Sequence, residues 1–317
     1  MHRLDASFIL QDMTLGKSIN KNGDFDVYHL KNDRLVVEVV PELGAKITSI
    51  FDKKANREWL WAPDASRKLF RSKDKSTYEA SSLLGIDECC PSVVSWQNYP
   101  DHGELWSRAW DVDPSKWVEQ SIVETTFNFE GIPVTFTRSL ELVENTLLLN
   151  YEAQNGSDRS FPFLWCIHPL IQIRAGDQIQ LGEGSGWTHF TGLLNCLDDE
   201  PQLTEKNPVG SSILIDPNTT IKQGVAGYLK GFVKTPDDGV CKVKNALTDE
   251  ELRFEMVPEQ LPSIGIWINR GGWNGFHHIG IEPTTYPNDF PERIDEEDDH
   301  PMLAAKETKN WSLRISV

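Results

Sequence analysis

The chain has 317 residues, and 39% of them are hydrophobic, which is enough for a sizeable core and unlike the composition of a disordered chain. Its formal net charge of −17 argues against nucleic acid and anionic membrane surfaces as partners and, more weakly, against a strongly anionic substrate. Large β-sandwiches often exceed about 200 residues as one unit, and no clean linker divides this sequence, so we expect a single domain over residues 1–317.

The N-terminus and the cysteines indicate a cytoplasmic protein. The first residues lead into no apolar core of the kind that a secretory signal needs, and no stretch approaches the roughly 18 apolar residues of a membrane helix. An odd number of cysteines without a signal predicts reduced thiols, and no pair has the CxxC spacing of a zinc site. The cysteines are Cys89, Cys90, Cys166, Cys196 and Cys241.

Alternating and β-branched segments predict strands along most of the chain, and no long segment has the helical period. Turn signals such as Asn155-Gly156 and Asp238-Gly239 separate them, whereas residues 182–217 predict a long irregular excursion. Many short strands with regular turns indicate an all-β sandwich or barrel. The predicted strands are residues 34–40, 45–51, 121–129, 132–142, 147–153, 161–173, 227–233, 240–247, 251–257, 263–269, 276–282 and 311–317.

Several common functional motifs are missing from the sequence. There is no G-x-S-x-G elbow, no Walker A lysine and no G-x-G-x-x-G after a strand, so an α/β-hydrolase and a nucleotide-binding site have no support. His277 and His278 are adjacent, and on a strand they point to opposite faces and cannot bind one metal ion together. We therefore expect neither a cofactor nor a metal.

Three segments place titratable side chains among apolar or turn-forming neighbours. Glu282 ends an apolar strand, His168 interrupts another, and His102 precedes a glycine in a proline-containing loop. Each also has a purely structural interpretation, respectively a surface group, a hydrogen-bonded core histidine and a turn residue. The segments read Tyr99-Pro100-Asp101-His102-Gly103-Glu104-Leu105-Trp106, Trp165-Cys166-Ile167-His168-Pro169-Leu170 and Gly280-Ile281-Glu282-Pro283-Thr284-Thr285-Tyr286-Pro287.

The order and spacing of these segments resemble the galactose mutarotases, or aldose 1-epimerases, over nearly the whole chain. The resemblance implies a large antiparallel β-supersandwich with a sugar in an open cleft on one face. The motifs that carry it are Val40-Pro41-Glu42-Leu43-Gly44-Ala45-Lys46-Ile47, Asp101-His102-Gly103, Ile167-His168-Pro169, Gly280-Ile281-Glu282-Pro283 with Tyr286-Pro287, and the closing stretch from Met302 to Leu313.

The same resemblance implies catalytic roles. Glu282 would be the base that takes the proton from the anomeric hydroxyl, His168 the acid that protonates the ring oxygen, and His102 a hydrogen-bonding group that helps to polarise that oxygen. The chemistry explains these residue types independently, because mutarotation removes one proton and delivers another, and a carboxylate and an imidazole can exchange these roles near neutral pH. Neither a metal nor a nucleotide is needed.

Further residues are candidates for binding sugar hydroxyls or stacking on the ring, although each has an equally good structural interpretation. They are Asp87, Glu88, Arg108, Trp267 and Asn269. The Asn-Arg motif of galactose-specific members is not clear in this chain, with Arg71 the nearest basic candidate, and the aspartate with which those members hold sugar hydroxyls has no evident counterpart. The sequence therefore does not support galactose as the sugar.

Three alternatives remain open beside a mutarotase acting on a free aldose, with the protein a monomer or a homodimer. A phosphosugar mutarotase would need converging cations, for which Arg71 and Arg108 are candidates. A non-catalytic carbohydrate-binding protein could use the same fold. A glycosidase or lyase would need a second carboxylate across the cleft from Glu282, for which Asp87 or Glu88 are the candidates.

Overall fold

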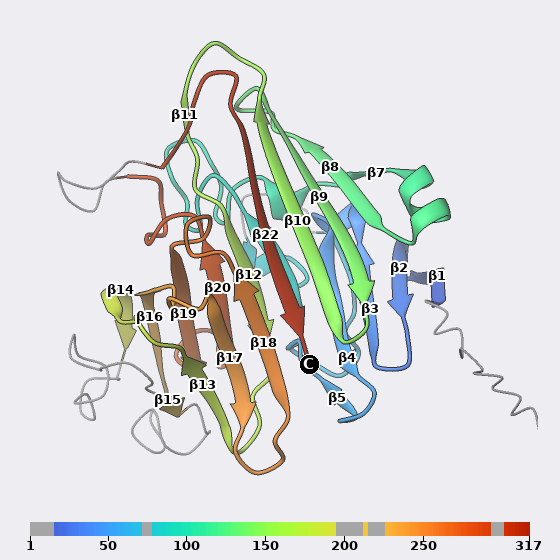
Figure 1. The fold of residues 1–317 in the computed structure, drawn as a ribbon, viewed down its shortest axis with the longest axis vertical. Coiled ribbons are helices and arrows are strands. Elements are labelled where there is room, and N and C mark those ends of the chain that lie inside the picture. Colours follow the sequence, from blue (N-terminus) through green and yellow to red (C-terminus); the bar gives the residue numbers. More distant parts are fainter. Residues whose placement is uncertain (1–15, 72–77, 195–211, 215–225, 293–300) are drawn as a thin grey trace, which may run out of the picture.

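Figure 1 shows a computed structural model in which almost every regular element is a β-strand. The structure describes residues 16–71, 78–194, 212–214, 226–292 and 301–317. Within these ranges no helix is both long enough and apolar enough to cross a membrane. The helical turns are η1 (Pro41–Leu43), η2 (Tyr78–Ala80), η3 (Leu105–Ser107) and the π-helical η4 (Lys116–Gln120).

The first sheet contains eleven strands among the described residues, and all neighbours in it are antiparallel. Its short strand β5 (Arg57–Glu58) pairs with β4 at the side of the main path. The path runs β1 (Gly16–Asn22), β2 (Phe25–Lys31), β3 (Leu35–Val40), β4 (Lys46–Asp52), β6 (Ile86–Cys89), β12 (Cys166–Ile171), β20 (His277–Thr284), β19 (Ser263–Arg270), β16 (Gly227–Lys234) and β14 (Trp187–Leu194).

The second sheet contains nine strands among the described residues and is also antiparallel, and Figure 1 shows its long strands β22, β10 and β9 side by side. Its order is β15 (Ser212–Leu214), β13 (Asp177–Leu181), β17 (Val240–Asn245), β18 (Glu251–Met256), β22 (Thr308–Ser316), β10 (Thr146–Asn155), β9 (Val134–Val143), β8 (Val123–Asn128) and β7 (Asp111–Val112). A small pair joins β11 (Phe161–Pro162) to β21 (Met302–Leu303).

Burial along the strands explains how the two sheets pack. Strands β9 and β10 alternate buried and more exposed residues, so one face of each lies in the core and the other toward solvent. The central strands β12 and β20 of the first sheet are buried at nearly every position. One of their faces packs in the apolar core that both sheets share, and the other must be covered as well. That second face carries the candidate site.

The prediction of an all-β antiparallel fold is confirmed, and every predicted strand overlaps an observed one. The predicted strand over residues 161–173 is interrupted, because it contains both β11 and β12. The irregular excursion predicted over residues 182–217 is wrong for β14 and β15, and residues 195–211 and 215–217 of it lie outside the described residues. The pairing of β14 with β16 is broken by register shifts that remove the simple alternation. The polar edge strand β1 was missed because it buries no continuous apolar face.

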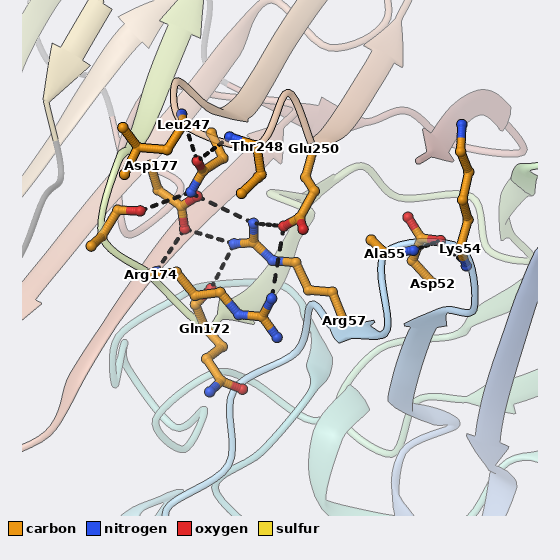
Figure 2. Close-up of polar contacts among 12 residues, drawn as sticks. Asp52, Lys54, Ala55, Arg57, Gln172, Arg174, Asp177, Leu247, Thr248 and Glu250 are labelled. Carbon is orange, nitrogen blue, oxygen red and sulfur yellow. Dashed lines mark hydrogen bonds and ion pairs between the residues drawn. The ribbon is translucent and has the colours of Figure 1, made fainter.

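Buried ion pairs join the two sheets. Arg57 on β5 reaches across to Asp177 on β13, with Nη2 to Oδ2 at 2.6 Å, and to Glu250 at 2.9 Å; Figure 2 shows its guanidinium between the two carboxylates. Arg138 on β9 lies 2.9 Å from Glu88 on β6, and both side chains are fully buried. Because a buried charge is costly without its partner, these pairs hold the sheets in one relative position.

Replacing Arg138 with methionine should destabilise the fold strongly, because Glu88 would keep its burial and lose its cation. We expect the free energy of unfolding to fall by about 3–5 kcal/mol in urea titrations. The matched control is Lys242→Met, which breaks a partly exposed pair with Glu251 and should cost less than about 1 kcal/mol. Equal losses in the two variants would contradict a special role for the buried pair.

Candidate active site

Three neighbouring strands of the first sheet place polar side chains in one row across its outer face. His168 on β12 is paired with Asp87 on β6, and the register of β12 with β20 sets it opposite Glu282. His168 Nε2 lies 3.6 Å from Glu282 Oε1. The antiparallel pairing therefore brings together two residues that are more than a hundred positions apart in the sequence.

A cavity of about 220 Å³ opens over this row. Aromatic and histidine side chains form much of its wall, and carboxylates lie at Asp101 and Asp289. Glu282 is fully buried and reaches the cavity through two residues that do line it, His168 and Lys230.

The two oxygens of the Glu282 carboxylate have different surroundings. Oε2 accepts a very short hydrogen bond from Lys230 Nζ on β16, two strands away, whereas Oε1 has no hydrogen-bond partner among the described residues. Burial raises the pKa of Glu282 above its usual value, and the neighbouring Lys230 charge opposes that rise. Burial opposes the charge of Lys230 in turn, but Glu282 and Asp289 outweigh it and raise the pKa of the lysine.

Two glycines make room for this carboxylate. A Cβ atom at Gly280 would lie 2.7 Å from Glu282 Oε1, and one at Gly265 would lie 3.0 Å from Oε2. Gly265 lies on β19 and is paired with Glu282 on β20. Strand β19 separates β20 from β16, so Lys230 reaches across it. The space for the ion pair is therefore built into the backbone of β19 and β20.

The two predicted histidines lie next to each other. The His102 and His168 rings are 4.9 Å apart in an edge-on arrangement, and His102 stacks on Tyr78 at 3.7 Å. Burial, with smaller contributions from the His102 and Lys230 charges, lowers the pKa of His168 well below its usual value. His168 therefore rests as a neutral imidazole at neutral pH.

The loop that presents His102 depends on unusual backbone conformations. His102 has a φ of 63°, and the following Gly103 has a φ of 68°. A Cβ at Gly103 would lie 1.9 Å from the carbonyl oxygen of Cys90, so only glycine fits there. His102 Nδ1 lies 3.2 Å from Asp101 Oδ2 without the geometry of a hydrogen bond, so the contact that orients the ring is its stacking on Tyr78.

The predicted substrate-binding residues Asp87 and Glu88 point to opposite faces of β6, as successive strand residues do. Asp87 accepts a hydrogen bond from Tyr78 at 2.8 Å and contacts Lys46, so it supports the ring on which His102 stacks without lining the cavity. Glu88 lies in the core between the sheets, with Arg138, Tyr151 and Trp165 as hydrogen-bond partners. The structure therefore does not bring Glu88 to the site.

The remaining predicted residues are divided in the same way. Trp267 lines the cavity, but Asn269 is fully buried and bonds to the backbone of Trp273, so it holds the loop that carries a lining residue. Arg108 pairs with Glu104 and Glu130 beside a separate surface cavity, and Arg71 lies over Phe25. Neither arginine lines the cavity that holds the histidines.

Sequence reasoning missed Lys230 and Asp289. Lys230 interrupts an otherwise apolar strand, a signal of the same kind as that of His168. Asp289, 3.8 Å from Lys230, lies in a loop whose sequence carries no comparable signal. Among the described residues no three His, Cys, Asp or Glu side chains gather as metal ligands would. Cys196 lies outside the described residues, and Cys89, Cys90, Cys166 and Cys241 are buried free thiols.

Comparison with known proteins assigns the chain to a family. The sequence profile of the family described as aldose 1-epimerase matches residues 26–256. The chain belongs to the aldose 1-epimerase family. The matched region of this family member ends before Glu282, so the importance of that residue rests on its position in the structure. No curated protein matches the chain in sequence.

Solved structures share the fold of this aldose 1-epimerase family member at low sequence identity. A galactose mutarotase-like protein from Clostridium acetobutylicum has a TM-score of 0.68 and 15% identity, covering 95% of this chain and 98% of its own. The Slr1438 protein from Synechocystis sp. has a TM-score of 0.65 and 13% identity, with coverages of 96% and 98%. A galactose mutarotase related enzyme from Lactobacillus acidophilus has a TM-score of 0.64 and 14% identity, with coverages of 92% and 96%.

Replacing Gly280 with alanine should disturb the site from within. The new Cβ would lie 2.7 Å from Glu282 Oε1, so the carboxylate that Lys230 holds would have to shift, and we expect a loss of about 1–3 kcal/mol in the free energy of unfolding. Gly186→Ala is the matched control, because a Cβ there meets nothing within 4 Å, and it should change stability by less than about 0.5 kcal/mol. A Gly280→Ala variant as stable as this control would contradict the described packing.

Proposed function

We propose that this family member is an aldose 1-epimerase that interconverts the anomers of a free aldose or a close derivative. The observation that carries the proposal is the 3.6 Å approach of His168 Nε2 to Glu282 Oε1 beneath a cavity, with His102 beside them. A carboxylate and an imidazole at this separation can serve opposite ends of one hemiacetal. The family match and the shared fold support the same reaction class.

The reaction needs no group beyond these side chains. In the reactive form Glu282 is ionised and His168, which is neutral at rest, has taken up a proton from solvent. Glu282 Oε1 takes the proton of the anomeric hydroxyl while His168 delivers its proton to the ring oxygen, and the bond between C1 and the ring oxygen breaks to leave an aldehyde. Rotation about the first C–C bond and the reverse proton transfers close the ring on the other face. Because Glu282 exposes no surface at rest, the sugar must shift the side chains of Lys230 or His168 to reach it. Such tightening on binding is common in acid–base sites.

The electrostatics suit a pair that exchanges roles. Burial raises the pKa of Glu282 and lowers that of His168, so the two pKa values move toward each other from 4.5 and 6.5. Ring closure requires each group to do the opposite of what it did in ring opening. The two shifts make protonated His168 a stronger acid and ionised Glu282 a stronger base, which favours the proton transfers of ring opening.

The cavity favours a single neutral sugar ring. Its volume of about 220 Å³ is below the roughly 300–1,000 Å³ of sites for larger ligands, and Trp267 offers a face for the apolar side of a ring. Among the lining residues that the structure describes, Lys230 is the only lysine or arginine, and its ammonium is already paired with the Glu282 carboxylate. Carboxylates at Glu79, Asp101 and Asp289 would repel a phosphate, so this lining supports a free aldose over a phosphosugar.

Replacing Glu282 with glutamine should abolish the acceleration of anomer exchange while the fold remains. Polarimetry on a panel of freshly dissolved aldoses would first identify a sugar whose mutarotation the parent protein accelerates. On that sugar we expect kcat to fall by about 10²–10⁴-fold, because the amide cannot take a proton. An unchanged rate would remove the assignment, and sugar binding without any acceleration by the parent would point to a carbohydrate-binding protein instead.

Activity should be lost on the acid side at a pH set by Glu282. Because His168 must carry the proton that it delivers, kcat/KM should fall at higher pH as His168 loses that proton. Because the carboxylate form of Glu282 is the base, kcat/KM should also fall on the acid side as the pH drops through the pKa of Glu282. Because burial raises that pKa, the inflection should lie above 4.5. Exchange rates would be measured across pH with the spontaneous rate in each buffer subtracted. An inflection at or below 4.5 would contradict the buried environment described for the base.

A further inference from the structure

We infer that Lys230 is a positioning residue for Glu282: its ammonium holds Oε2 and leaves Oε1 as the oxygen that faces His168 and exchanges the proton. This inference rests on the proposed acid–base role of Glu282. It assigns a function to a lysine that touches the reacting carboxylate from two strands away.

The two oxygens of Glu282 are not equivalent. Oε2 accepts from Lys230 Nζ and lies 3.9 Å from Cys166 Sγ, so its lone pairs are occupied. Oε1 is buried, lacks a hydrogen-bond partner among the described residues and lies 3.6 Å from His168 Nε2. A buried acceptor left without a donor is costly unless a ligand supplies one, and an anomeric hydroxyl is such a donor.

The surrounding backbone makes room for the carboxylate in the orientation that Lys230 holds. Gly265 and Gly280 leave space that the carboxylate fills, with Oε2 toward the first and Oε1 toward the second. Lys230 is paired with Trp267 on β19, two residues from Gly265, so its side chain reaches Glu282 diagonally across that strand. In this orientation the ammonium bonds one oxygen, and the other is the oxygen that lies near His168.

The charges keep Lys230 in place. Its ammonium lies 3.8 Å from Asp289 Oδ1 as well as against Glu282, so two carboxylates share one cation at the cavity wall. The other titratable groups that face Glu282 are His168 and Cys166 from β12, Cys89 from β6 and His102 from its loop. Lys230 is thus the nearest positive charge, and it favours the ionised carboxylate that a base requires.

The test is the protonation of Glu282 itself, read by infrared difference spectroscopy of the carboxyl band and assigned by its loss in Glu282→Gln. Lys230→Met and Lys230→Gln should raise the pH at which Glu282 takes up its proton by about one to three pH units. Lys230→Arg, which keeps the charge, should restore most of the parent behaviour. Lys242→Met, which removes a lysine paired with Glu251 on the other sheet, is the matched control and should leave the titration unchanged.

Kinetics supply a second reading on any sugar that the parent accelerates. The acid limb of kcat/KM should move upward by the same amount in Lys230→Met and Lys230→Gln, so that activity at a pH just above the parent inflection falls by about tenfold or more. A Glu282 titration that is the same in the parent and in both uncharged variants would overturn the inference. The spectroscopic result decides this even if the parent accelerates no sugar, which would refute the proposed function separately.

Discussion

The site depends on a carboxylate that is buried where water does not solvate its charge. Glu282 has no exposed surface, so its charge must be balanced by a neighbour, and Lys230 bonds Oε2 while the neutral His168 lies 3.6 Å from Oε1. A buried ion pair seldom adds to stability over an apolar pair of the same size. Its presence under a cavity is therefore better explained by chemistry, because it holds one reactive oxygen at a fixed place.

The fold supplies what this arrangement needs. Strands β12 and β20 are buried on both faces, so one face can complete the core while the other carries polar groups in a nearly dry environment. The Arg57 and Arg138 ion pairs fix the two sheets against each other. With that support the sheet acts as a rigid base, and the distance between His168 and Glu282 is set by strand register and not by a flexible loop.

Much of this could be predicted from the sequence, and what could not has a physical reason. Alternation gave the long strands, and the motifs around His102, His168 and Glu282 gave three residues that the structure brings together. Successive residues of a strand point to opposite faces, so a shift of one residue decides whether Asp87 or Glu88 faces the cleft. The composition of the segment does not reveal which one does.

Lys230 shows a different limit of sequence reasoning. Its partnership with Glu282 spans β19 and exists only because β16, β19 and β20 are neighbours, an order that follows from tertiary pairing. The strand containing Lys230 was predicted, but nothing local to it points to a carboxylate fifty-two residues away. The role of Gly265 and Gly280 in admitting the carboxylate is equally invisible before the strands are paired.

The most direct test of the account is a double-mutant cycle between His168 and Glu282, with kcat for anomer exchange measured for the parent, His168→Asn, Glu282→Gln and the double variant. Residues that act as one acid–base unit lose nearly all of their effect when either is removed. The account predicts that the double variant is about as slow as the slower single variant. Losses that add in free energy would contradict it, because the two groups would then be acting independently.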